Sequence, residues 1–562
     1  MKKIASLILS FATALSLTAQ NRAVERVYVS TDKDVYVAGE RVWCSAFCVQ
    51  PSGALSDISR MAYLELHGPA NMAATARISL EAGRGGGYLD LPAALPTGNY
   101  RLVAYTAQNK ADKKYDYAGI ASKTLSVFNV LSSDRQEGGV EIVDEETYRQ
   151  QMAQVVEAAP CGNVSLTWSD GRLTLANATD QPLTMSLSVW HDDGFLTNGN
   201  PGIADFMDGV RRVGKPQFDA TVLPDLEGEV IYGHVEGFSE EMIPQLSGKY
   251  AFFSSPSDKS DLYAAPIRED GSVTFFTAGI FGNKECVCEI EGIDPTLNCH
   301  VELQSPYVNA SVPTTSSLLL SPSLSDALRQ RSVSMQLERR FASDTLFELL
   351  PYRDGGLLDE GGAIRYRLDD YTRFITMEEV FIEFIPELRI RKDDNGRPGI
   401  QVRLLDAPSN PVFSTGSSLM LLDGVPVFDH QKIIEYDPLL VESVDIYPNT
   451  YYVGSRSFEG VVNFVTYKRN LPAMRFDGNA RVVDYQGVCL PLAWTGASFA
   501  DNGDYPDYRQ TVYWHPLLRV GAEESLSVPV RLPAYKGLFR VVAEGLSADG
   551  TPFRAAISFE VE

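Results

Sequence analysis

The stretch between about Phe374 and Lys468 constrains the fold most, because helix, strand and turn signals follow one another closely there. Thr376 and Glu379 form a capping-box pair, which predicts a short helix ending near Pro386. Strands are predicted at 388–391, 400–405, 418–422, 441–447 and 461–466, with turns at 393–397 and 423–426. The order predicts one small α/β domain, which we bound at 372–468.

The same stretch resembles the plug domain of TonB-dependent outer-membrane receptors. The likeness rests on the order helix, strand, Asp-Gly turn, "ESVDIY" from Glu442 and "VGSRSFEGVVNFVT" from Val453. It covers less than a fifth of the chain. The family usually has Tyr-Gly where Val453-Gly454 stands, and Thr-Lys where Thr466-Tyr467 stands. Only 94 residues follow Lys468, of the 562 in the chain, whereas a receptor barrel needs some twenty strands of ~10 residues.

A plug domain is sized for a barrel lumen, so the resemblance implies a separate barrel protein as partner. Polar loops of the plug would face the wall or the mouth of that barrel. The residues expected to contact the partner are Asp423, Gly424, Pro426, Gly454, Arg456 and Gly460. For the two later glycines, ordinary turn geometry is the competing interpretation.

The first 20 residues have the three-part form of a secretory signal: Lys2-Lys3, an apolar run from Ile4 to Leu17, and a short polar end. The alternative, a membrane anchor, needs about 20 apolar residues, and no stretch reaches that length. Net charge is −24, and loss of the two lysines gives −26 for the mature chain. That field repels phosphate backbones, so we expect no nucleic-acid partner. We expect export to the periplasm, the outer membrane or the cell surface.

The chain has seven cysteines, an odd number that leaves at least one unpaired. Cys44 and Cys48 lie four apart in a predicted strand, ~13 Å from each other and too far to bridge. Cys286 or Cys288 could reach Cys299, but buried free thiols are the default interpretation. No pair of Cys-x-x-Cys motifs is present, so we expect no metal site, and nothing indicates a cofactor.

Residues 24–132 are predicted to form one β-sandwich. "TDKDVYVAGE" from Thr31 and "PTGNYRLVAYT" from Pro96 resemble the second macroglobulin-like domain of the α2-macroglobulin family. Val42–Val49 is apolar at both parities, which predicts a strand covered on both faces. The trapping chemistry of that family needs a Cys-Gly-Glu-Gln thioester, which this sequence lacks.

The fold class expected overall is mainly β and multi-domain, with several macroglobulin- or immunoglobulin-like sandwiches and one plug-like domain. The unit at 224–304 resembles the carboxypeptidase-regulatory-like sandwiches that precede plugs in exported Bacteroidetes proteins. The remaining segments are a signal peptide at 1–20, a second β-sandwich region at 160–222, a helical connector at 323–350 and a C-terminal sandwich at 505–562.

Two local clusters of ionisable residues are candidate sites. His191-Asp192-Asp193 invites a catalytic or metal interpretation, but a strand end with a polar turn is favoured because no further His lies nearby in sequence. The helix after Ser323 is locally basic, with Arg329, Arg331, Arg339 and Arg340. It could bind an acidic partner, but contact with an acidic domain of its own chain is favoured.

The sequence has no Gly-x-Ser-x-Gly elbow, no His-Glu-x-x-His and no phosphate loop, so we expect no enzyme. The predicted function is that of an accessory or plug-like subunit of an outer-membrane β-barrel complex in transport, secretion or assembly. The alternative is a periplasmic or surface binding or adhesion module that uses the plug fold as a scaffold. In that case aromatics such as Tyr451, Tyr452, Trp494 and Trp514 would contact glycans. Any small-molecule ligand is left open.

Overall fold

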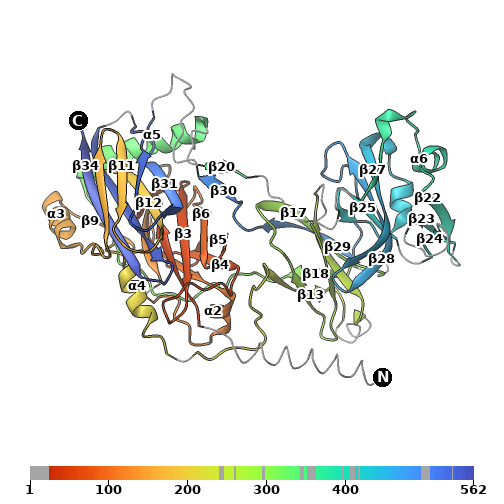
Figure 1. Ribbon diagram of the computed structural model, residues 1–562, viewed down its shortest axis with the longest axis horizontal. Helices are drawn as coiled ribbons and strands as arrows, with labels where there is room; N and C mark the ends of the chain where they lie inside the picture. The colour runs from red at the N-terminus through yellow and green to blue at the C-terminus, as the bar shows by residue number, and fades with distance from the viewer. Residues whose placement is uncertain are drawn as a thin grey trace. The chain divides into compact units, whose positions relative to one another are not determined.

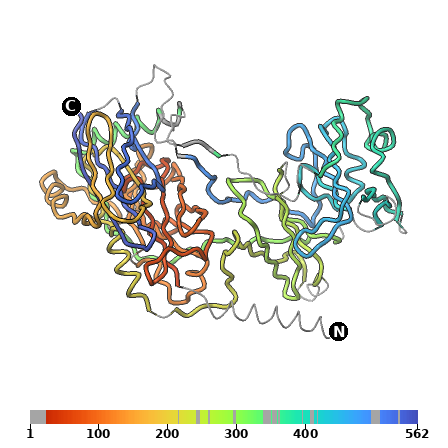
Figure 2. Tube along the Cα trace, viewed as in Figure 1, coloured from red at the N-terminus to blue at the C-terminus, as the bar shows by residue number. Residues whose placement is uncertain are grey.

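The computed structural model forms two compact units, coloured along the chain in Figures 1 and 2. Unit 1 comprises Met1–Gly228, Tyr307–Pro351 and Val488–Glu562, and unit 2 comprises Glu229–Pro306 and Tyr352–Gly487. The chain therefore passes between the units four times. The described residues are 24–562 except 120, 215, 240–245, 258–260, 294–297, 342–346, 351–357, 359–361, 394–395, 406–411, 416–417, 495–506 and 534–535. The predicted signal peptide lies outside them.

The first sandwich of unit 1 confirms the mainly β prediction for the N-terminal segment. One sheet has the order β1-β3-β6 and the other β2-β8-β7-β4-β5. Strand β3 is buried on both faces, as its apolar pattern predicts. Cys44 and Cys48 point into the sandwich core, while Phe47 packs against Phe206 and its neighbours in α4 (Ile203–Val210). The strands are β1 (Arg26–Thr31), β2 (Val35–Val37), β3 (Arg41–Val49), β4 (Met61–His67), β5 (Met72–Ser79), β6 (Arg84–Asp90), β7 (Gly98–Tyr105) and β8 (Lys123–Phe128).

The second sandwich of unit 1 joins two segments that the sequence analysis treats as separate, 160–222 and 505–562. Strand β12 pairs with β31 on one side and β33 on the other, and β11 pairs with β32. Figure 1 shows the late blue strands among the early gold ones. The predicted boundary between them is therefore corrected, because each segment alone supplies only part of either sheet. The strands are β10 (Val164–Ser169), β11 (Arg172–Asn177), β12 (Leu183–Asp192), β31 (Thr511–Val520), β32 (Ser525–Pro529), β33 (Gly537–Ser547) and β34 (Pro552–Val561).

Short elements connect the sandwiches of unit 1. Helix α5 (Ser325–Phe341) occupies much of the predicted connector at 323–350. Strand β9 (Val140–Ile142) pairs in parallel with β19 (Leu318–Leu320), and β20 (Phe347–Leu349) pairs with β30 (Leu492–Trp494). The other helical segments are α2 (Ala107–Ala111), α3 (Glu145–Gln154) and the 3-10 turn η2 (Pro322–Leu324).

Unit 2 contains a sandwich that extends beyond the predicted 224–304. Its sheets have the orders β16-β13-β18 and β15-β14-β17-β29, so residues after the α/β stretch supply an edge strand. Phe253 and Phe275 meet in its core with Cys286, Cys288 and Cys299. All seven cysteines are free thiols, which fits the default interpretation. The strands are β13 (Val230–Glu236), β14 (Tyr250–Ser255), β15 (Asp261–Pro266), β16 (Ser272–Phe276), β17 (Asn283–Ile290), β18 (His300–Leu303) and β29 (Ala480–Gln486).

The rest of unit 2 is one small domain, here called the α/β body, residues 364–474. A five-stranded sheet of order β21-β27-β28-β25-β26 and a smaller sheet β22-β23-β24 enclose one apolar core. Helix α6 begins after Thr376, whose hydroxyl accepts from the Glu379 amide at 3.3 Å. The elements are β21 (Ile364–Arg367), η3 (Leu368–Asp370), α6 (Met377–Phe384), β22 (Leu388–Lys392), β23 (Pro398–Leu404), β24 (Val412–Phe413), β25 (Leu419–Leu422), β26 (Val425–Pro426), α7 (His430–Ile434), η4 (Pro438–Leu440), β27 (Val441–Val453) and β28 (Arg456–Thr466). In the described part of the chain, every helix is too short or too polar to cross a bilayer.

Candidate functional site

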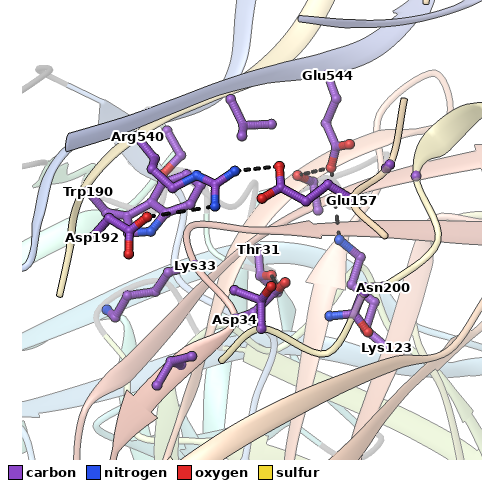
Figure 3. Close-up of a pocket in the computed structure, with 18 of the residues that line it drawn as sticks. Thr31, Lys33, Asp34, Lys123, Glu157, Trp190, Asp192, Asn200, Arg540 and Glu544 are labelled. Atoms are coloured by element: carbon purple, nitrogen blue, oxygen red, sulfur yellow. Dashed lines mark hydrogen bonds and ion pairs between the residues drawn. The ribbon is translucent and has the colours of Figure 1, made fainter. Parts of the chain in front are cut away.

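A charged cavity lies between the two sandwiches of unit 1. Its volume is about 110 Å³. Its walls come mainly from β1 and the loop after it, from β12 and the loop after it, and from β33, with Lys123 of β8. Figure 3 shows Lys33, Asp34 and Lys123 on one side and Arg540 and Glu544 on the other. Cations and carboxylates are interspersed, so the cavity does not select ligands by the sign of its charge.

Most of these charges are paired within the chain. Glu544 accepts hydrogen bonds from the hydroxyls of Tyr28 at 3.0 Å and Ser30 at 2.6 Å. Lys123 Nζ lies 3.9 Å from the same carboxylate. Arg540 pairs with Glu157 and lies 3.7 Å from Asp192 (Figure 3). Ion pairs and hydrogen bonds from hydroxyls that link two sheets fix the position of one sheet on the other. The main role of these polar side chains is therefore to hold the two sandwiches together.

Asp34 is one of the acids that line this cavity. Burial raises the pKa of its carboxyl, and the nearby Lys123 ammonium opposes that rise. Thr31 donates a hydrogen bond to Asp34 at 3.4 Å. A raised pKa alone does not make a catalytic acid, because nucleophilic or hydrolytic chemistry also needs a convergent base and acceptor. The Ser188 hydroxyl is instead used structurally, donating to the Asp32 carbonyl at 2.5 Å.

The structure separates the His191-Asp192-Asp193 cluster. The His191 ring packs on Phe539, with centroids 5.3 Å apart, and burial lowers its pKa. Asp192 turns toward Arg540, while Asp193 accepts a two-pronged contact from Arg331 at 2.5 and 2.8 Å. The strand-end interpretation therefore holds. Across the described residues, no group of three potential ligands is arranged for a metal ion.

The contact between Arg331 and Asp193 also bears on the basic helix. The guanidinium of Arg331 is 3 % exposed and donates a third bond to the Val35 carbonyl at 2.8 Å. Ser334, one turn on, donates to the Tyr508 carbonyl at 2.7 Å. Helix α5 thus rests on its own chain through this face, as predicted.

Three of the residues predicted to contact a partner lie inside the α/β body. Asp423 is 2 % exposed and accepts from the Thr466 amide and hydroxyl, each at 2.7 Å, and from the Leu471 amide at 2.9 Å. Gly424 donates to Asn463 at 2.9 Å, and Pro426 is buried in β26. This turn ties the sheet together, and its burial removes it from any contact surface.

The other three predicted contacts hold the body to the neighbouring sandwich or to itself. Arg456 makes a two-pronged ion pair with Glu291 at 2.7 and 3.0 Å. Gly454 has φ +58°, and a Cβ there would lie 2.8 Å from the Ala264 carbonyl. Gly460 has φ +82°, and a Cβ there would lie 2.7 Å from Val402. Turn geometry and close approach account for both glycines, and a role in partner contact remains a prediction.

An exposed apolar surface on the α6 segment escaped the sequence analysis. Ile375 and Ile382 are 78 % and 73 % exposed, and Tyr371 is 41 % exposed beside them in sequence. Tyr371 stacks on Phe384 with centroids 4.3 Å apart. The spacing of the apolar residues along the predicted helix would have indicated that Ile382 is exposed. Val380 and Phe381 lie on the buried face, and Ile382 is one residue off it.

The known proteins compared below are similar to this chain only at low sequence identity and low TM-score. No protein-family model matches the chain, and no curated protein matches it. Among solved structures, an alpha-2-macroglobulin from E. coli aligns over 96% of this chain and 40% of its own, with 10% identity and a TM-score of 0.23. A Salmonella alpha-2-macroglobulin aligns over 96% and 39%, with 10% identity and a TM-score of 0.24. The E. coli adhesin FdeC aligns over 48% and 60%, with 12% identity and a TM-score of 0.14.

This chain spans about two fifths of the length of those macroglobulins. At such TM-scores the similarities carry no argument about activity.

Proposed function

We propose that this protein is a non-enzymatic, exported cell-envelope protein that binds an outer-membrane β-barrel supplied by another chain. The contacting part is the α/β body, the plug-like domain of the sequence analysis. The observation that carries the proposal is that residues 364–474 fold around one core with an apolar surface left outside it. Exposed apolar side chains within a helix and just before it, here Ile382 and Ile375, favour a protein–protein contact.

The charged cavity of unit 1 favours a structural role over a catalytic one. Its guanidinium groups, Arg331 and Arg540, are engaged by Asp193, Glu157 and Asp192, and its serine hydroxyls serve as structural donors. Groups committed to internal pairs are poorly placed to attack a substrate.

Site-specific crosslinking in whole cells tests the barrel partner. A photoreactive amino acid replacing Ile382 should attach the protein to a heat-modifiable outer-membrane protein. The matched control carries the same group in place of Val156, which is 81 % exposed in unit 1. Crosslinks to the same protein from both positions, or none to a barrel from Ile382, would contradict the proposal. Fractionation of the same cells checks export.

The adhesion alternative has one specific observation in its favour. Tyr452 is 71 % exposed on β27, where an aromatic ring can stack on a sugar. Trp514 is fully buried and so unavailable, and the side chain of Trp494 lies outside the described residues. Glycan-array binding that Tyr452→Ala abolishes would favour adhesion.

A further inference from the structure

A second pocket of unit 1 differs in its charge from the rest of the molecule. Its volume is about 410 Å³, and it lies between the loop after β8 and the first turns of α5. That volume far exceeds the roughly 30 Å³ that one water molecule takes up in the liquid. Although the chain carries 73 acidic residues, none of the described residues that line this pocket is Asp or Glu. Two arginines and four serines line it: Arg135, Arg329, Ser132, Ser133, Ser325 and Ser332.

Buried hydrogen bonds hold the loop wall of this pocket in place. Asn129, 8 % exposed, accepts from the amides of Leu131 and Ser132 at 2.9 and 2.8 Å. Its amide nitrogen donates to the carbonyl of Leu95 at 2.8 Å, and the Thr97 hydroxyl accepts from its backbone at 2.9 Å. The loop that carries Ser132, Ser133 and Arg135 is therefore fixed before any ligand arrives.

The helical wall is fixed as well. The two-pronged contact of Arg331 with Asp193 anchors α5, and so sets the place of Ser325, Arg329 and Ser332 along it. Arg329 forms an ion pair with Asp326 at 3.3 Å, and the pair lies on the surface: the Arg329 side chain is 78% exposed and that of Asp326 is 89% exposed. An exposed pair of this kind is worth less than about 1 kcal/mol, so an incoming anion can displace Asp326. Arg135 is exposed and makes no ion pair with a described residue.

We propose that this pocket binds a phosphate-type oxyanion. Guanidinium groups and hydroxyls are the donors that such anions take in proteins, with the two arginines supplying charge and the serines supplying geometry. The apolar part of the lining, with Phe128, Leu320 and Leu328, leaves room for the carbon portion of a phosphate ester. Free phosphate and the headgroup of an anionic phospholipid share this chemistry. The proposal does not depend on the barrel partner.

The test compares two charge-matched double variants of the full chain. Arg135→Gln with Arg329→Gln removes the two guanidiniums of the pocket. Arg149→Gln with Arg211→Gln removes two exposed arginines elsewhere in unit 1, and so lowers the net charge by the same amount. Equilibrium dialysis against radiolabelled inorganic phosphate at low salt should show saturable binding that the pocket variant weakens at least tenfold and the control leaves unchanged.

Vesicle flotation identifies the source of the anion. If a headgroup is the ligand, the protein should float with phosphatidylglycerol vesicles but not with phosphatidylcholine vesicles, and the pocket variant should stay at the bottom. Flotation by neither, with phosphate binding intact, assigns the pocket to a free anion. The proposal is overturned if neither phosphate nor phosphatidylglycerol binds saturably, or if both double variants bind equally.

Discussion

At the scale of single residues, two glycines of the α/β body allow the cost of a left-handed backbone to be measured apart from the cost of steric crowding. Gly460 and Gly396 both have left-handed φ, +82° and +79°. Only Gly460 is crowded, because a Cβ there would meet Val402, whereas nothing lies within 4 Å of the site at Gly396. Gly396→Ala should cost about 1 kcal/mol from its backbone conformation alone, and Gly460→Ala about 2–4 kcal/mol. Denaturant unfolding of the two variants measures the difference, and equal losses would refute the packing of β28 on β23.

The buried carboxylate of Glu65 fastens the segment after Pro306 to the first sandwich. Burial opposes its ionisation, but bonds from His67, from Tyr105 and from the Ala310 amide at 3.0 Å lower its pKa to about 2. A lowered pKa means that the stabilisation is present above the ordinary value of 4.5 and is lost as pH falls toward 2. Glu65→Gln should destabilise unit 1 by about 2 kcal/mol at pH 7. Urea unfolding measures this, with the exposed Glu145→Gln as a control expected to change little.

Glu289 in β17 contributes to stability with the opposite pH dependence to Glu65. Burial raises its pKa to about 8, although Lys432 opposes the rise. Here the contribution to stability is full below pH 4.5 and is lost as pH rises through 8, because the unfolded chain ionises first. The melting temperature of unit 2 should therefore fall between pH 5 and pH 9 by roughly 2–4 °C more in the parent than in Glu289→Gln. An identical fall in both would show that Glu289 is not the group responsible.

At the scale of elements, one ion pair joins β28 of the α/β body to Glu291, the residue that follows β17. The Arg456 and Glu291 side chains are 30% and 19% exposed and form two hydrogen bonds. Arg456→Glu should destabilise unit 2 by about 2 kcal/mol, and adding Glu291→Arg should restore most of that loss. Calorimetry of the single and double variants tests the pair. Failure of the second change to rescue would mean that the two side chains do not interact.

Elements with local causes were predictable from the sequence. The capping pair at Thr376 and Glu379 acts over a few residues and is visible in the pattern. Strand pairing between distant segments was not predictable. Nothing in the sequence of β12 indicates that its partner strands, β31 and β33, lie more than 300 residues away. Burial of Asp423 was missed for the same reason. An Asp-Gly turn usually faces solvent, and only the tertiary bonds from Thr466 and Leu471 bring it inside.

At the scale of the whole molecule, the chain is a multi-domain, mainly β protein in which an α/β body is inserted between segments of β-sandwiches. That insertion explains how far apart in sequence the paired strands lie. It also leaves two isoleucines exposed on the α/β body, Ile375 just before α6 and Ile382 within it.

The most direct measurement is co-purification from native membranes in mild detergent. The parent protein should bring a single outer-membrane barrel protein with it in fixed proportion. Ile375→Ser with Ile382→Ser should lose that barrel at least tenfold while folding normally by circular dichroism, and Val156→Ser should retain it. A parent protein that elutes alone as a monomer, or a barrel that both variants retain equally, would contradict the account.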